Sequence, residues 1–454
     1  MKAAKYVDCT LILENEKTLS LQYYDEDGTR CSEKGELGSD PVVRLTVKRL
    51  NEWVNFGLKQ QEASRGKENP VTVDDLRVIG LNLYRILFSD RKIQDKFHDV
   101  YRRFQAAYKE QAEQSGEGLR LRLRIVFEKA AESLGRLPWE FLFVPDEDNP
   151  ERGFFFAGER TELILTRYVP VSDLVKKLSP PAPSRLKILV AVSEPSGLGA
   201  VDESEFQRLL AQIREITREE IPVLRGADCT YQKLGKTLDA YRPHIFHYIG
   251  HGEEGRLALV KSPEDPDYDE GEGERPVRWV TSEQFRKLFG VAKPRLVFLH
   301  ACKGAAASSQ DAFNSCARQL VYADIPAVVA MQYSISSHDA NLFAKTFYEE
   351  LGRGRDVDEA VKAGRLALGG KVWPFWEHPR FGTPVVYLQT DKPIVLPLPE
   401  EQESREAAAR TQPVPAGGSR VAVPGPAVAP SPRPGSSEAA PWPGGQKPQT
   451  GFEG

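Results

Sequence analysis

A thiol and an imidazole each follow an apolar segment of this chain, and together they could carry out nucleophilic chemistry. Cys302 comes at the end of a segment whose apolar run is Leu296–Leu299, and His251 and Gly252 come directly after the segment Ile245–Gly250. Short apolar runs of this kind are typical of strands buried in a parallel sheet. Open α/β sheets bind their ligands at the carboxyl ends of such strands. If the two strands are neighbours, the spacing predicts a Cys–His dyad.

The dyad has the parts that a thiol hydrolase needs. His251 can raise the thiolate fraction of Cys302 and later protonate the leaving amine. Gly252 has no Cβ, so its N–H can approach a substrate carbonyl closely, and with the N–H of Cys302 it would form an oxyanion hole. The alternative is that Cys302 is a small core residue, as cysteines at strand ends often are.

The region that follows the proline-rich linker at residues 180–183 predicts the fold that would position this dyad. Apolar strands alternate there with amphipathic helices of about 10–15 residues, which indicates a mostly parallel sheet covered by helices on both sides. We expect an α/β fold, a three-layer α/β/α sandwich over residues 184–394, preceded by an α/β amino-terminal part and followed by a disordered tail. The tail, from residue 396, is rich in Pro, Gly, Ala and Ser, a composition that cannot bury enough apolar surface to order itself.

The amino-terminal part shows weaker patterns. Residues 1–40 alternate as hairpin strands around the turn Asp25–Gly28, and the segment Val42–Gln61 has helical spacing. Thr72 and Asp75 predict a capping box that opens another helix. The segment Leu119–Phe127, read as LRLRLRIVF, alternates apolar residues with arginine, which favours a half-buried or edge strand. We place the domain boundaries at 1–120, 121–395 and 396–454.

Composition excludes several classes of function. The chain has 454 residues and a net charge of −4, so we expect no nucleic-acid partner. No apolar run approaches the roughly 18 residues that span a bilayer, so we expect no membrane partner. The five cysteines are scattered without a CxxC pair, which indicates a reducing, cytoplasmic setting with no metal site. No glycine-rich phosphate loop follows any strand, and we expect no cofactor.

Several motifs resemble the CHAT family, caspase-like cysteine peptidases related to caspases and separases. They are LPWEFL (137–142), HYIGHG (247–252), VFLHACKGA (297–305), IPAVVAMQYSISSHDA (325–340), FAKTFYEELGRG (343–354) and DEAVKAGRLAL (358–368). The separation of His251 and Cys302 is close to the roughly 50 residues found in caspases. The resemblance implies a caspase-like sheet, His251 as base, Cys302 as nucleophile, and the N–H groups of Gly252 and Cys302 as oxyanion donors.

The resemblance also implies a regulated endopeptidase, often an effector in prokaryotic conflict or cell death. We expect a protein substrate, and a regulatory protein partner that binds the amino-terminal region or the tail. The competing interpretation is a catalytically silent CHAT-fold scaffold.

Two residues are candidates for a specificity pocket. His300 should face the same side as Cys302 and holds the position of a caspase glutamine that binds the P1 side chain. Asp339 either caps a helix with Ser336 or lies at the pocket mouth.

Overall fold

The computed structural model describes residues 6–25, 27–64, 70–114, 118–146, 149, 152–169, 186–217, 220–253, 255–269, 271, 273–290, 293–301, 312–322, 325–333, 335–369 and 379–389. The linker at 180–183 and the tail from residue 396 lie outside these residues, so the expectations about them stay predictions. The described residues belong to one compact unit.

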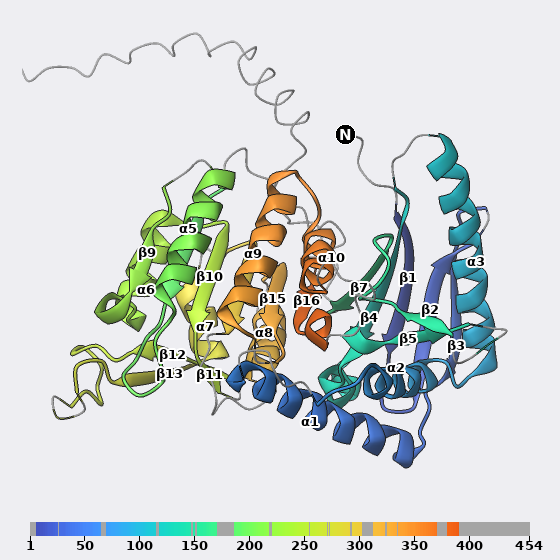
Figure 1. Ribbon diagram of the computed structural model, residues 1–454, viewed down its shortest axis with the longest axis horizontal. Coiled ribbons are helices and arrows are strands. Elements are labelled where there is room, and N and C mark those ends of the chain that lie inside the picture. The colour runs from blue at the N-terminus through green and yellow to red at the C-terminus, as the bar shows by residue number, and fades with distance from the viewer. Residues whose placement is uncertain are drawn as a thin grey trace, which may run out of the picture. The chain divides into compact units, whose positions relative to one another are not determined.

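One 11-stranded sheet forms the centre of this unit, in the order β3-β2-β1-β4-β7-β16-β15-β14-β10-β8-β9. Its strands are β1 (Tyr6–Leu13), β2 (Thr18–Tyr24), β3 (Arg30–Glu36), β4 (Arg120–Phe127), β7 (Leu163–Tyr168), β8 (Ile188–Val192), β9 (Val223–Arg225), β10 (Ile245–Gly250), β14 (Leu296–Ala301), β15 (Ala327–Met331) and β16 (Pro384–Leu388). Two small sheets accompany it, one of β5 (Phe143–Pro145) and β6 (Gly153–Phe155), the other of β11 (Gly252–Glu253), β12 (Arg256–Val260) and β13 (Val277–Thr281). Figure 1 shows the large sheet running through the unit.

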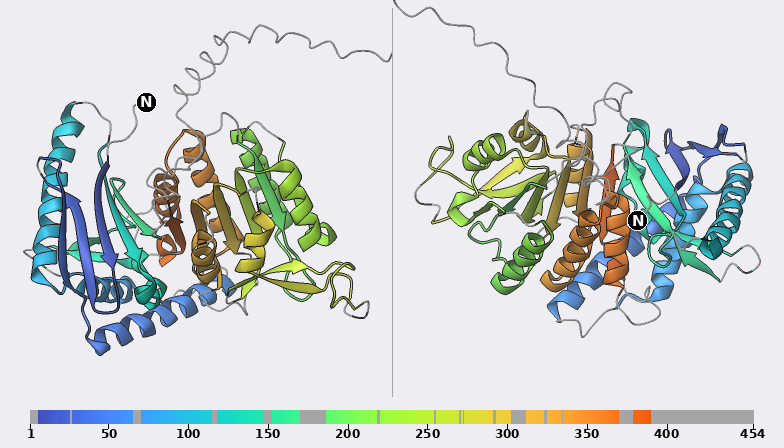
Figure 2. Two further views of the ribbon diagram at one scale, coloured as in Figure 1. Left: turned by 180° about the vertical axis from the view of Figure 1, so that it is seen from behind. Right: turned by 90° about the horizontal axis from the view of Figure 1, so that it is seen from above.

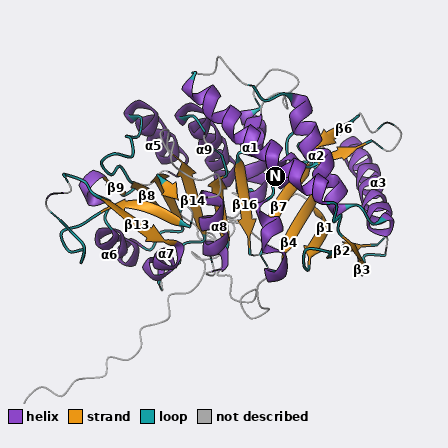
Figure 3. Cartoon of the chain, turned by 90° about the horizontal axis from the view of Figure 1, so that it is seen from below, coloured by secondary structure: helices purple, strands orange, loops and turns teal. Residues whose placement is uncertain are grey.

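Helices cover both faces of the half of the sheet that contains β8 to β15. On one face lie α5 (Glu203–Thr217), α9 (Ser337–Gly352) and α10 (Val357–Leu368). On the other face lie α6 (Tyr231–Tyr241), α7 (Ser282–Phe289) and α8 (Ala312–Tyr322). Figure 3 shows α5 and α9 on one side of the strands, with α6, α7 and α8 on the other. The predicted three-layer α/β fold with a mostly parallel sheet is confirmed.

The pairing explains this layering residue by residue. β8, β9, β10, β14 and β15 are parallel to one another, and the described side chains of all but the edge strand β9 are buried on both faces. Phe246 and Tyr248 point to the α7 side, where both rings meet Phe285. The alternate residue His247 stacks on Phe298 of β14 and contacts Tyr348 of α9. A continuous apolar strand is therefore the sequence signature of burial under two helical layers.

The amino-terminal residues extend the same sheet. β1, β2 and β3 pair in antiparallel order, and β1 is parallel to β4. Three helices pack around this end of the sheet, as the views in Figure 2 show: α1 (Pro41–Ala63), α2 (Val73–Leu87) and α3 (Arg91–Gln114). Thr72 and Asp75 form the predicted capping box at the start of α2. The expected domain boundary at residue 120 falls at the start of β4, and the sheet continues across it.

One expectation about β4 was wrong. The alternation of apolar and arginine residues favoured a half-buried or edge strand, but β4 is an interior strand between β1 and β7. Arg122 is buried and pairs with Asp356 at 2.7 Å and Asp358 at 2.6 Å. The opposite charges of Asp356, just before α10, and of Asp358, in its first turn, thus allow an arginine to face the interior. The pairing also uses the Asp356 carboxylate, which makes no capping bond to its own helix.

Candidate functional site

The two strands that precede the candidate dyad are direct neighbours in the sheet. β10 and β14 are parallel, and their register pairs Ile245 with Leu296 and, at the last position, Gly250 with Ala301. The next residue along each chain is His251 and Cys302. His251 is described by the structure, whereas Cys302 lies outside the described residues. The two strands therefore end at the same position of the same edge, immediately before the imidazole and the thiol.

The ring of His251 is held by a backbone carbonyl. Its Nε2 lies 3.2 Å from the carbonyl oxygen of Gly199, and the residue is only 3% exposed. A carbonyl oxygen can only accept a hydrogen bond, so this contact assigns the proton to Nε2. The neutral ring then carries its lone pair on Nδ1. This is the tautomer in which Nδ1 can accept a proton from a thiol.

Burial favours the neutral form of His251. Desolvation lowers the pKa of His251 below its ordinary value, while the hydrogen bond to Gly199 and the charge of Glu194 act in the opposite direction. A base must be unprotonated before it can accept a proton, so this shift suits the role.

A salt-bridged loop holds the Gly199 carbonyl in place. Glu194, just after β8, accepts hydrogen bonds from Arg225 at 2.8 Å and from the N–H of Val201 at 2.9 Å. Burial alone would raise the pKa of Glu194, but Arg225 and the Val201 N–H lower it. Gly199 itself has a φ of +88°, which favours glycine. Sequence analysis missed these residues, because nothing local marks a loop carbonyl 52 positions upstream as a partner of His251.

The backbone around His251 is also fixed from the opposite face. The hydroxyl of Tyr248 lies 2.9 Å from the His251 carbonyl oxygen and 2.7 Å from that of Ala258. A Cβ at Gly250 would lie 2.5 Å from that hydroxyl, so no larger residue fits there without displacing it. Gly252, the predicted oxyanion donor, begins β11, which pairs with β12. Its role as a donor stays a prediction.

His300 lies in a buried cluster of rings. It is buried on β14, with its Nδ1 3.4 Å from Nε2 of His247, and it stacks on Phe298. Burial lowers the pKa of His300 to about 4 and that of His247 well below its ordinary value. His300 faces α9, on the same side as the ring of His247. Its expected role in specificity stays a prediction.

Asp339 lies in the first turn of α9 and has both carboxylate oxygens engaged. The hydroxyl of Ser336 accepts a hydrogen bond from the Asp339 N–H at 3.1 Å and donates one to its carboxylate at 2.7 Å. The other oxygen pairs with Arg380 at 3.2 Å. The structure therefore contains the helix cap that the sequence offered as one of two interpretations. The alternative, a charge-reading position at a pocket mouth, stays a prediction.

The four described cysteines are poor candidates for a nucleophile. Cys9, Cys229 and Cys316 are fully buried, and burial raises the pKa of each thiol to about 12. The pKa of Cys31 is also raised, by desolvation and by the neighbouring Asp25 carboxylate. Thiolates, not thiols, attack carbonyl groups.

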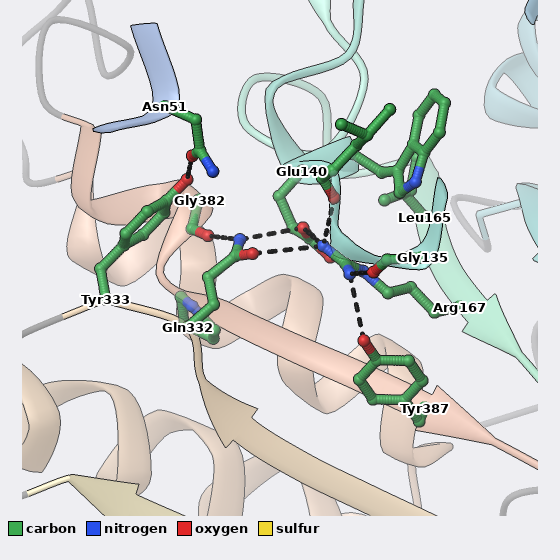
Figure 4. A network of polar contacts seen from close by, with 12 residues as sticks. Asn51, Gly135, Glu140, Leu165, Arg167, Gln332, Tyr333, Gly382 and Tyr387 are labelled. Atoms are coloured by element: carbon green, nitrogen blue, oxygen red, sulfur yellow. Dashed lines mark hydrogen bonds and ion pairs between the residues drawn. The ribbon is translucent and has the colours of Figure 1, made fainter. Parts of the chain in front are cut away.

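A buried polar network lies behind β15 and organises several family-like motifs. Glu140, from the LPWEFL motif, pairs with Arg167 of β7 and with Arg365 of α10, and Gln332 also donates to it at 3.0 Å. Arg167 donates further to Gly135 and Tyr387, as Figure 4 shows. All three charged side chains are essentially inaccessible to water. The network joins the loop before β5 to β7, β16 and the end of β15.

The network borders a pocket of about 450 Å³ between α1 and the end of β15. Tyr333, two residues beyond β15, donates a hydrogen bond to Asn51 of α1 in its wall. Polar side chains of both charges surround the opening, among them Glu16, Arg44 and Lys48. The amino-terminal region thus contributes directly to the surface at the carboxyl end of β15, next to β14.

The sequence of this chain matches the model of a known protein family. The model of the CHAT domain matches residues 79–380, more than half of the chain. The chain belongs to the CHAT family. The match confirms the resemblance expected from the sequence, and it includes the second half of α2 and all of α3 as well as the strands around His251.

Similarity beyond the family is remote. One solved chain that resembles this one comes from the Saccharomyces cerevisiae separase–securin complex, with 12% identity and a TM-score of 0.42. The similar region covers 85% of this CHAT protein and 30% of that chain, so this chain spans less than a third of its length. No curated protein matches. Among the described residues, no helix is long and apolar enough to cross a membrane.

Proposed function

We propose that this CHAT protein is a caspase-like cysteine endopeptidase that cleaves a protein partner, with Cys302 as nucleophile and His251 as base. One observation carries the proposal: β10 and β14 end in register immediately before these two residues, and the Gly199 carbonyl holds His251 in the tautomer that leaves Nδ1 free to accept a proton. The family resemblance supports a regulated effector of a prokaryotic conflict or cell-death pathway, acting in the cytoplasm.

The reaction follows from this arrangement. Nδ1 of His251 accepts the proton of the Cys302 thiol, and the thiolate adds to the scissile carbonyl of the substrate. The N–H groups of Gly252 and Cys302 stabilise the oxyanion. The protonated imidazole then gives its proton to the leaving amine, which breaks the C–N bond and leaves a thioester. Water, deprotonated by His251, hydrolyses the thioester and regenerates the thiol.

A catalytically silent scaffold is the second candidate, and the burial of His251 favours it. At 3% exposure the imidazole offers little of its surface to solvent. The dyad can be used only if a substrate reaches Nδ1. If none does, the dyad is present but unused.

The test compares four chains on a proteome-derived peptide library, with new amino termini mapped by mass spectrometry. Wild type and Cys31→Ala, the matched cysteine control, should cut the same bonds. Cys302→Ala and His251→Ala should cut none, and their far-UV circular dichroism should match that of wild type. Cleavage by Cys302→Ala would show that the mechanism is wrong, and a wild type that cuts nothing would favour the scaffold.

A further inference from the structure

Exposed apolar side chains are concentrated on one helix of this protein. Among the described residues, seven large apolar or aromatic side chains are more than a third exposed, and four of them lie on α1. These are Val42, Leu45, Trp53 and Phe56, which are 69%, 54%, 38% and 48% exposed. We call these four residues the α1 stripe. Isolated exposed apolar residues are ordinary, but a contiguous row of them marks an interaction site.

The helical period places the four residues of the stripe on one side of α1. At 3.6 residues per turn, these four positions and Arg49 between them fall within about 80° of one another around the helix axis. The opposite side of α1 is the packed one, with Val47, Val54 and Leu58 buried. Trp53 and Phe56 stack on each other, with ring centroids 5.6 Å apart, so the aromatic end of the stripe is preorganised.

The stripe is symmetric about its middle residue. Its apolar positions lie four and seven residues to either side of Arg49. When two copies of α1 cross antiparallel about a two-fold axis at Arg49, Val42 meets Phe56 of the other copy and Leu45 meets Trp53. Each contact then pairs an aliphatic residue with an aromatic one. A two-fold interface requires this self-complementarity, and a surface made for an unrelated protein does not.

The charged residues beside the stripe are also compatible with self-association. Arg49 would lie on the axis beside its own copy, but each Arg49 pairs with Glu52 of its own helix at 3.1 Å. Arg49 and Glu52, which lie beside the four apolar residues of the stripe, thus contribute one positive and one negative charge that cancel. In the antiparallel pair, Glu52 of one copy also lies close enough to pair with Arg49 of the other copy, because Glu52 is only three residues along the helix from the two-fold axis.

We propose that α1 is a homodimer interface, in which two copies of this chain pair their α1 stripes antiparallel about Arg49. The stripe extends over 14 residues, about 21 Å of helix. A contact of this length lies at the small end of specific interfaces, so the dimer forms and dissociates with concentration. Because α1 also contacts the end of β15 through Asn51 and Tyr333, dimerisation would bring the two candidate sites to neighbouring surfaces. The proposal does not depend on peptidase activity.

Sedimentation velocity of the full chain over a concentration series tests the proposal. Wild type should shift from monomer to dimer, and Trp53→Glu should raise the dissociation constant at least about tenfold, because it buries a charge at the aromatic contact. Tyr24→Glu is the matched control, since Tyr24 is 52% exposed on β2 and lies outside the stripe. It should dimerise as wild type does, and circular dichroism should show that both variants are folded.

A symmetric cross-link distinguishes this geometry from any other dimer. Arg49→Cys should form a disulfide between the two copies of residue 49 under mild oxidation, because that residue lies on the axis. Arg91→Cys, at a side chain 91% exposed on α3, should not. A wild type that stays monomeric throughout the series would overturn the proposal, and so would a dimer that Trp53→Glu leaves unchanged or that Arg49→Cys fails to cross-link.

Discussion

Replacing Glu140 with glutamine should destabilise the fold more than any ordinary polar substitution. The Glu140 carboxylate forms ion pairs with both Arg167 and Arg365, and all three side chains are at most 1% exposed. Glutamine keeps the shape and loses the charge. The other acceptors of the two guanidinium groups are neutral: Gly135, Leu137, Gln332 and Tyr387 for Arg167, and Pro384 and Leu165 for Arg365.

The magnitude follows from the cost of an uncompensated buried charge. Breaking a buried ion pair by removing one partner costs about 3–5 kcal/mol. The pKa of Arg365 is already lowered to about 10 by burial, with Glu140 as the group that opposes this most strongly. Domains are stable by only about 5–15 kcal/mol. Glu140→Gln should therefore remove about a fifth or more of the free energy of unfolding.

Urea unfolding, followed by far-UV circular dichroism and by tryptophan fluorescence, measures the effect. Glu283→Gln is the control, because Glu283 makes comparable ion pairs with Arg286 and Lys287 while 66% exposed. It should change the free energy of unfolding by less than about 1 kcal/mol. An effect of Glu140→Gln as small as that of the control would refute the reasoning that the network stabilises the fold through charge.

Three further outcomes are expected. Because the pKa of His300 is about 4 in the fold and about 6.5 when unfolded, the unfolded state binds a proton first as pH falls. His300 should therefore account for about 2 kcal/mol of the stability lost between pH 7 and pH 5, and His300→Gln should remove that part of the pH dependence of urea unfolding. Glu194→Gln removes a charge that raises the pKa of His251, so an NMR titration of the His251 ring should show a lower pKa; an unchanged or higher value would contradict the electrostatic account. Asp339→Asn should lower the melting temperature only slightly, because a cap and a partly exposed pair with Arg380 contribute about 1 kcal/mol each; loss of a preference for Lys or Arg at P1 would instead show a pocket role.

The sequence predicted the parts of the site that depend on local pattern. Apolar runs ending in His251 and Cys302 indicated two buried strands, and the structure pairs those strands in register. Thr72 and Asp75 predicted their capping box because all of its partners lie within four residues. The nonlocal parts could not be read in this way. The Gly199 carbonyl, the Glu194–Arg225 pair and the charges around Glu140 all join segments far apart along the chain.

The arginines of β4 show that a local pattern can predict a strand without predicting its position in the sheet. Alternation in LRLRLRIVF correctly predicted a strand, but the position of that strand depended on where Asp356 and Asp358 lie in the fold. Because those carboxylates form ion pairs with Arg122, a charged side chain can be buried on an interior strand of the sheet. The periodicity of a sequence shows which side chains share a face of the strand. Whether that strand lies at the edge or in the interior of the sheet depends on the partners that other segments bring to it.

The central claim, that Cys302 and His251 act as one dyad, is tested most directly by site-resolved alkylation. Wild type and His251→Ala are treated briefly with iodoacetamide at pH 7, and mass spectrometry measures the modified fraction of each of the five cysteines. Cys302 should react at least about tenfold faster than Cys31 in wild type, and His251→Ala should abolish most of that advantage. A Cys302 that reacts no faster than Cys31, or whose rate is unchanged in His251→Ala, would contradict the account.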